Sequence, residues 1–386
     1  MSRLLNGLVC IAVGCSYLPL GRAATGDATR GGQLLRDRDC TRCHKVDGVG
    51  GDAASDLGKR TSRNYTPAYV AGVMWNHAVS GSAGLGKSAL SEDQTADLFA
   101  YFASRRYFEP LGDAKRGQQV FDAKGCFACH GISEAIPGGA SPITEWGSLR
   151  DPIAFAQEMW NRSPAMVRAF ARQGTRHPHL TSQELNDLLV YLENLPAVRG
   201  KEPEFRLSPA ETGLELFQAK GCAGCHRGKL SLERSRSRHT MADVSAAMWN
   251  HPPGDTYIRP TLSYSEMSGL VSYLWSLEDR GDETRGRIVY ARKKCGACHS
   301  AAGSRPDGSR IAFPGQREAV PMSIVKAMAS HGPRLNGEAS GAGAAWPQFR
   351  GSEMTDLVAY LETQARSASE GSEQAAAAGL GSFQRR

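Results

Sequence analysis

The chain has 386 residues, which is longer than one typical folding unit, so its length predicts several domains. A hydrophobic content of 41% suits a globular protein, and beyond residue 20 no stretch is apolar enough to span a bilayer. Taken alone, the formal net charge of +7 would favour an anionic partner such as a nucleic acid.

The first 23 residues predict a signal peptide. Arg3 provides the positive charge, residues 4–20 are mostly apolar, and Gly21 and Ala23 are small residues beside a cleavage point. We therefore expect the mature protein to be periplasmic. The alternatives are a buried N-terminal helix and lipoprotein anchoring at Cys15. The apolar run continues past this cysteine, which favours the signal peptide.

Eight of the ten cysteines fall into four Cys-x-x-Cys-His motifs, and the other two lie in the predicted signal peptide. The motif is typical of haem c attachment. Its two thiols can add to the vinyl groups along one porphyrin edge, and the adjacent histidine then binds the iron as proximal ligand. The sequence thus predicts four covalently bound haem c groups, attached through Cys40, Cys43, Cys126, Cys129, Cys222, Cys225, Cys295 and Cys298, with iron bound by His44, His130, His226 and His299.

Three other uses of these cysteines compete with haem attachment. Zinc would need four ligands and hence paired motifs, a redox dithiol would not require the histidine, and eight cysteines could also form disulfides. Export favours haem, because haem c is attached outside the cytoplasm. The propionates of four haems would offset the positive charge of the chain, so we expect no nucleic-acid binding.

The motifs belong to a longer internal repeat. A predicted helix precedes each motif, with a glycine nine residues before the first cysteine, and a later helix carries a tyrosine. Glycine inside a helix costs about 1 kcal/mol relative to alanine, so its recurrence indicates a close approach by another helix. Before the second of these later helices, Thr181 and Glu184 predict a capping box. We expect each glycine to pack against the tyrosine of its repeat, in the pairs Gly31 and Tyr101, Gly117 and Tyr191, Gly213 and Tyr273, and Gly286 and Tyr360.

This order of helix, motif, distal segment and final helix resembles class I cytochrome c, in which the first and last helices cross at the glycine. The resemblance covers about residues 26–365. It implies an all-α fold of four consecutive small cytochrome c-like haem domains. The C-terminal residues lack hydrophobic periodicity and predict a disordered tail. We therefore expect domains at 24–110, 111–200, 201–279 and 280–365, and the tail at 366–386.

A third repeated segment offers candidates for the distal iron ligand. It reads Met-Trp-Asn-His in the first and third repeats, and the methionine and histidine, three residues apart, share one helix face. Either could therefore reach the iron. We expect its tryptophans, Trp75, Trp160 and Trp249, to pack on the haem.

The methionine position is filled in all four repeats, which favours methionine as the distal ligand: Met74, Met159, Met248 and Met328. In the alternative, histidine is the ligand and Met166 or Met159 substitutes in the second repeat, where Arg162 occupies the histidine position. The candidates in this alternative are His77, His251 and His331. Both choices depart from class I cytochromes, in which the ligand methionine lies in a loop nearer the last helix.

These features predict a multihaem cytochrome that transfers electrons between periplasmic or surface redox partners, and we expect an electron carrier rather than an enzyme. One alternative is a haem enzyme with an open distal site, acting on peroxide or on a sulfur or nitrogen compound. Arg162 makes the second domain the favoured place for it. Another is a cytochrome subunit of a membrane or periplasmic dehydrogenase. The sequence identifies neither the donor nor the acceptor.

Overall fold

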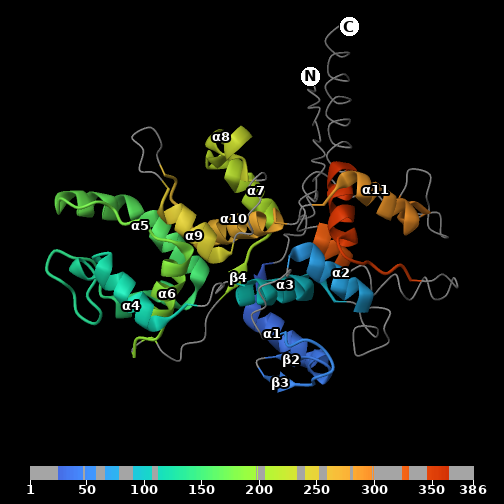
Figure 1. The fold of residues 1–386 in the computed structure, drawn as a ribbon, viewed down its shortest axis with the longest axis horizontal. Coiled ribbons are helices and arrows are strands. Elements are labelled where there is room, and N and C mark those ends of the chain that lie inside the picture. Colours follow the sequence, from blue (N-terminus) through green and yellow to red (C-terminus); the bar gives the residue numbers. More distant parts are fainter. Residues whose placement is uncertain are drawn as a thin grey trace, which may run out of the picture.

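The computed structural model shows an all-α protein, as predicted, built from four repeats of the same helical pattern (Figure 1). The predicted signal peptide with Cys15, the C-terminal tail, Cys298 and His331 lie outside the described residues. Those described are 25–46, 48–57, 66–77, 90–106, 112–196, 198, 205–232, 240–251, 259–278, 281–297, 299, 324–329 and 346–364.

Each repeat begins and ends with a helix, and these two helices pack against each other. The first repeat has α1 (Ala28–Asp37) and α3 (Glu92–Arg106), and the second has α4 (Ala114–Ala123) and α6 (Ser182–Glu193). The third has α7 (Ala210–Ala219) and α10 (Tyr264–Ser276), and the fourth has α11 (Glu283–Arg292) and the helix 353–364. The predicted capping box of Thr181 and Glu184 begins α6, which confirms that prediction.

Between these helices lie the cysteine turn and the segment expected to carry the distal ligand. The turns are η1 (Cys40–Arg42), η2 (Cys126–Ala128), α8 (Cys222–Cys225) and η7 (Cys295–Ala297). The distal helices are α2 (Pro67–His77), α5 (Pro152–Arg172), α9 (Met241–Trp249) and the helical residues 324–329. Short 3-10 turns add η3 (Ile143–Glu145), η4 (Gly147–Arg150) and η5 (Gly228–Leu230).

The glycine of each first helix lies directly against the backbone of the last helix, which confirms the predicted crossing. A Cβ added at Gly117 would lie 1.9 Å from the Asp187 carbonyl oxygen and 2.7 Å from Tyr191 Cβ. No side chain other than hydrogen fits such a contact. The same contact recurs with carbonyl distances of 2.2 Å for Gly31 and Asp97, 2.0 Å for Gly213 and Gly269, and 2.0 Å for Gly286 and Asp356.

An arginine–aspartate pair fastens this crossing in three repeats. In the second repeat Arg116 donates twice to the Asp187 carboxylate, at 2.8 Å, and the same carboxylate accepts the Asp113 backbone N–H. The third repeat has Pro209 at the position of Asp113, and proline has no N–H to donate. In this repeat two serines form the corresponding contact: the Ser208 backbone N–H donates to Ser268 Oγ at 2.7 Å.

The distal helices form hydrogen bonds with repeats other than their own. The Trp160 indole N–H of α5 donates to the Pro260 carbonyl of the third repeat, and Trp249 of α9 donates back to Pro178 of the second repeat, both at 2.8 Å. In the same way Trp75 of α2 donates to Pro347 of the fourth repeat at 2.7 Å. The repeats therefore form two pairs, the second with the third and the first with the fourth.

The asparagine after each of these tryptophans completes the contact. Asn161 accepts the Leu262 N–H and donates to its carbonyl, at 2.9 and 2.8 Å. The residue before each proline packs on the indole, as Arg259 does on Trp160, with 4.9 Å from the guanidinium carbon to the ring centroid. We call this set of contacts the Trp-Asn latch. The other two latches join Trp249 and Asn250 to His177, Pro178 and Leu180, and Trp75 and Asn76 to Trp346, Pro347 and Phe349.

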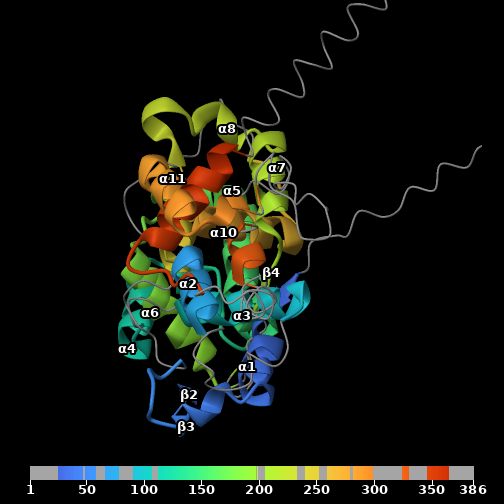
Figure 2. The same ribbon diagram turned by 90° about the vertical axis from the view of Figure 1, so that its right-hand side faces the viewer.

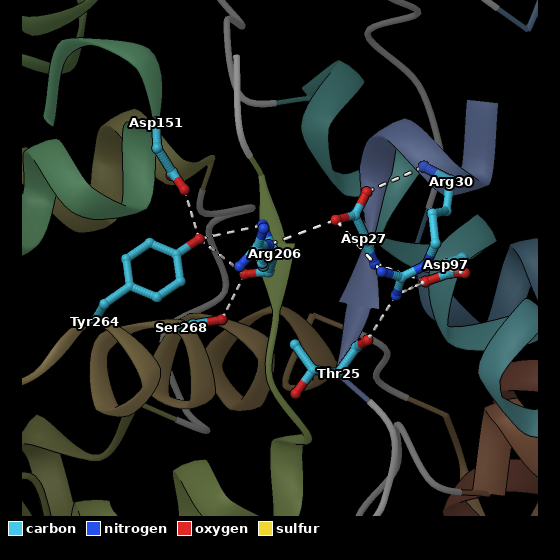
Figure 3. A network of polar contacts seen from close by, with 8 residues as sticks. All are labelled: Thr25, Asp27, Arg30, Asp97, Asp151, Arg206, Tyr264 and Ser268. Atoms are coloured by element: carbon cyan, nitrogen blue, oxygen red, sulfur yellow. Dashed lines mark hydrogen bonds and ion pairs between the residues drawn. The ribbon is translucent and has the colours of Figure 1, made fainter. Parts of the chain in front are cut away.

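A junction between the two pairs brings together residues of the first three repeats (Figure 3). Strand β1 (Gly26–Asp27) pairs antiparallel with β4 (Arg206–Leu207), which lies shortly after the predicted boundary between the second and third domains. Arg206 also forms an ion pair with Asp27 at 3.5 Å. On the side of Arg206 away from Asp27, the Tyr264 hydroxyl donates to the Asp151 carboxylate at 2.5 Å. This hydrogen bond connects the second repeat to the third.

The cysteine motifs of different repeats lie far apart along the molecule. The turn α8 is near the top of both views, and the hairpin of β2 (Lys45–Val46) and β3 (Val49–Gly50), beside the first motif, is at the bottom (Figures 1 and 2). Within the described residues, no helix combines the length and apolar character that a bilayer span requires.

Candidate haem sites

The second repeat contains a cavity of about 630 Å³, within the range expected for a cofactor site. Its walls include both cysteines and the histidine of the second motif, Cys126, Cys129 and His130. Helix α5, which follows the motif in the sequence, contributes Met159 and Arg162 to the same walls. The thiols, the candidate proximal histidine and the candidate distal ligand thus line one space, which is the arrangement that a covalently attached haem requires.

The cysteines of the motifs that the structure describes are free thiols, the group that adds to the haem vinyl groups. Cys126 and Cys129 are free thiols three residues apart on η2, as are Cys40 and Cys43 beside η1. Burial raises the pKa of Cys126 to about 11, and burial also raises the pKa of Cys40. Both are therefore protonated at neutral pH in the chain without bound haem.

Two of the candidate proximal histidines, His44 and His226, are oriented by backbone carbonyls. His44 Nδ1 lies 2.6 Å from the Ser55 carbonyl oxygen, and His226 Nδ1 lies 3.3 Å from that of Leu230. A carbonyl can accept but not donate, so Nδ1 carries the proton in each ring. The Nε2 atom is left as a metal ligand, which is the usual arrangement at histidine metal sites.

Burial favours the neutral form of the His130 ring. Burial lowers the pKa of its ring, and the positive charge of Arg162 lowers it further. The edge of the ring packs against Trp146, with centroids 4.9 Å apart. A neutral imidazole is the form that coordinates metal. In the fourth repeat the His299 carbonyl accepts a hydrogen bond from the Tyr290 hydroxyl.

The structure places the two sets of distal candidates differently. Met159 is buried and lines the cavity of the second repeat, and Met166, two helical turns beyond it in α5, lines the same cavity. In the first and third repeats the imidazoles lie near the proximal ones, with ring centroids 6.1 Å apart for His77 and His44 and 6.3 Å apart for His251 and His226. The predicted methionines of the other repeats, Met74, Met248 and Met328, are partly buried against the core.

The tryptophans of the distal segments have a role that the sequence did not reveal. They were expected to pack on the haem, and the structure shows in addition that their indole N–H groups bind the partner repeat. Trp249 of the third repeat lines the cavity of the second, so one latch contributes directly to a neighbouring haem site. The available signal was the proline two residues before a large apolar residue in three repeats, which marks the receiving loop.

Comparison with known proteins agrees with this geometry. The fold and the candidate site define a helical protein whose repeats carry a paired-cysteine and histidine motif after the first helix. Residues 28–105 and 114–196 each match the family model described as Cytochrome c, and no curated protein or solved structure matches the chain. These two segments belong to the cytochrome c family, so the chain contains repeated cytochrome c domains. It is therefore a haem-binding electron-transfer protein with covalently bound haem c.

Proposed function

We propose that the chain binds four haem c groups and carries electrons between redox proteins outside the cytoplasm. The observation that supports four groups is the repetition of one framework. In the third and fourth repeats a Cys-x-x-Cys-His motif follows a helix that crosses the last helix at glycine, as in the two matched segments. Bound haem iron supplies one-electron chemistry by changing between its ferric and ferrous states.

The contacts between repeats favour a relay whose order differs from the order in the chain. A latch joins the fourth repeat to the first, the β1–β4 pair joins the first to the third, and two latches join the third to the second. The aromatic rings of Phe99 and Trp275 add a contact between the first and third repeats, at 6.3 Å between centroids. We infer that the relay runs within each pair, between the fourth and first repeats and between the third and second.

The partners follow from the location and the length of this relay. Residues 1–23 favour export, and haem c attachment itself takes place outside the cytoplasm, so a periplasmic location agrees with both. A relay of several haems joins a donor at one part of the surface to an acceptor at another. A periplasmic or membrane dehydrogenase is one donor of this kind, and the protein would then act as its cytochrome subunit.

A haem enzyme at the second repeat is a second candidate, favoured by Arg162. The side chain occupies the histidine position of the other repeats and lines the cavity. Its guanidinium forms an ion pair with Glu158 at 2.5 Å, and an arginine carries no metal-ligating atom. Cyanide tests this candidate, because an open iron site would show a high-spin signal that cyanide converts to low spin.

The haem count tests the main proposal. The full chain would be expressed with a haem c maturation system, and haem would be measured by pyridine haemochrome and intact mass. We expect four haems, and three after the double substitution Cys222→Ser and Cys225→Ser. The matched double substitution Cys126→Ser and Cys129→Ser should also leave three. A parent protein with two haems, both lost only by changes in the first two motifs, would overturn the proposal.

A further inference from the structure

We propose that His77 and His251 are the distal iron ligands of the first and third repeats, so that these two sites each have two imidazole ligands. The second repeat differs, because its distal helix has no histidine at this position. The inference rests on the proposed function, in which both repeats bind haem. It concerns which side chain completes each site and therefore which sites have low or high reduction potential.

The spacing of the two rings carries the inference. A histidine nitrogen binds a metal at about 2 Å, and the ring centre lies about 1 Å further away, so two imidazoles on opposite sides of one ion have centroids about 6 Å apart. The centroid distances are 6.1 Å for His44 and His77 and 6.3 Å for His226 and His251. The same separation thus occurs in two repeats with different surrounding residues.

The orientation of His77 agrees with this role. Its Nδ1 lies 2.7 Å from the Val73 carbonyl oxygen, one helical turn back in α2, and that carbonyl can only accept. The proton is therefore on Nδ1, and the lone pair of the ring is on Nε2, the atom that would bind iron. His44, on the other side, is held in the same state by Ser55. Both rings of the first repeat have the carbonyl partner that ligating histidines usually have.

The Trp-Asn latch explains why these histidines face the proximal ones. Trp75 and Asn76 are fixed by the fourth repeat, and His77 follows them directly at the end of α2. In the third repeat the Arg259 guanidinium binds the His251 carbonyl, and the edge of Trp160 packs on the His251 ring at 5.6 Å between centroids. A neighbouring repeat therefore holds each histidine in place.

The second repeat provides the contrast within the same chain. Arg162 stands where the histidine would be, and two methionines of α5, Met159 and Met166, line the cavity instead. A thioether ligand raises the reduction potential of haem relative to a second imidazole. We therefore expect the second site to have a higher potential than the first and third. In the inferred relay it is paired with the third.

Spectroscopy of the intact haem-loaded protein tests the inference without any substitution. Low-temperature EPR should show low-spin signals typical of two imidazole ligands, for at least two haems per chain. Near-infrared magnetic circular dichroism should show a methionine–iron band for fewer haems than are bound. A methionine band with an intensity that accounts for every bound haem would overturn the inference.

Matched variants assign the sites. His77→Met should convert one bis-imidazole signal to a methionine-type signal, with the haem count unchanged, and His251→Met should do the same for a second signal. The neighbouring changes Met74→Leu and Met248→Leu should leave the bis-imidazole signals as they are. Loss of a methionine band in Met74→Leu, with no change in His77→Met, would overturn the inference. A count below four haems in the parent would contradict the proposed function instead, because the ligand signals are measured per bound haem.

Discussion

The indole of Trp75 stacks on the indole of Trp346, with ring centroids 4.7 Å apart and an angle of 22° between the planes. Trp346 Nε1 also donates to the Trp75 carbonyl at 3.3 Å, across 271 positions of sequence. This contact holds the first repeat against the fourth. The second and third repeats latch each other in both directions. The fourth repeat has Ala329 at the tryptophan position, so this position has no indole N–H to donate to the first repeat.

The first prediction concerns the stability contributed by this latch. Trp75→Phe removes the indole N–H and leaves the Pro347 carbonyl without its 2.7 Å partner. We expect the free energy of unfolding to fall by about 1–3 kcal/mol, the usual cost of leaving a buried polar group unpaired. Denaturant unfolding of the haem-loaded protein measures it.

Trp275→Phe is a matched control for this change. Trp275 is buried to a similar degree, with 8% of its surface exposed against 5% for Trp75. Its Nε1 has no hydrogen-bond partner among the described residues. The control therefore loses the same atoms without losing a hydrogen bond, and should cost less than Trp75→Phe. Equal losses in the two variants would mean that the latch hydrogen bond contributes nothing to stability.

The second prediction concerns the helix crossing. Gly117→Ala would place a Cβ 1.9 Å from the Asp187 carbonyl oxygen, so α4 and α6 would have to separate. We expect a loss of at least about 3 kcal/mol, at the upper end of the cost of overpacking. Gly147→Ala is the control, since a Cβ there meets nothing within 4 Å. If thermal unfolding midpoints of the two variants coincide, α4 and α6 are not held together at this contact.

This crossing shows what the sequence could predict. Gly31 and Tyr101 lie 70 positions apart, but an equivalent glycine and an equivalent tyrosine recur in every repeat. This repetition alone indicated that the two residues are in contact. The cysteine motifs were equally informative, because the spacing of two thiols and a histidine specifies their chemistry. Both features lie within one repeat, where a local pattern and a short chain determine the contact.

The latch was missed because it joins different repeats. Asn161 and Leu262 are 101 positions apart, and nothing in either segment states that the second repeat pairs with the third or the first with the fourth. The distal ligand remained open for a related reason. Met74 and His77 share one face of α2, and the fourth repeat sets the orientation of that helix by binding Trp75 and Asn76. Sequence reasoning could not choose between them without that contact.

The third prediction concerns acid stability. Burial alone would raise the pKa of Asp187, but hydrogen bonds from Arg116 and the Asp113 N–H lower it below its usual value. The folded state therefore binds this proton less tightly than the unfolded state, so the carboxylate stabilises the fold above the ordinary pKa of about 4. That stabilisation is lost as the pH falls through the lowered pKa.

Asp187→Asn removes the titrating group. We expect it to lower the free energy of unfolding at pH 7 by about 1–3 kcal/mol, as for a hydrogen bond to a charged group. The difference from the parent should shrink as the pH falls below about 4. Ser268→Ala breaks the equivalent contact of the third repeat, where no carboxylate is present, and should show a difference that does not depend on pH. A constant difference for Asp187→Asn as well would contradict the prediction.

The fourth prediction concerns the exceptional site of the second repeat. Arg162→His restores the residue found after Trp-Asn in the first and third repeats, in the middle of α5, where the Trp160 and Asn161 latch already holds the helix. The change removes an exposed pair with Glu158, which costs at most about 1 kcal/mol. We expect EPR to show an additional bis-imidazole signal, together with a lower reduction potential, because an imidazole would replace a thioether. Arg162→Gln provides the control, since it removes the same charge without supplying a ligand, and should keep the parent spectrum. An Arg162→His spectrum identical to that of Arg162→Gln would mean that this position of α5 does not face the iron, and the geometry inferred for His77 and His251 would not extend to the second repeat.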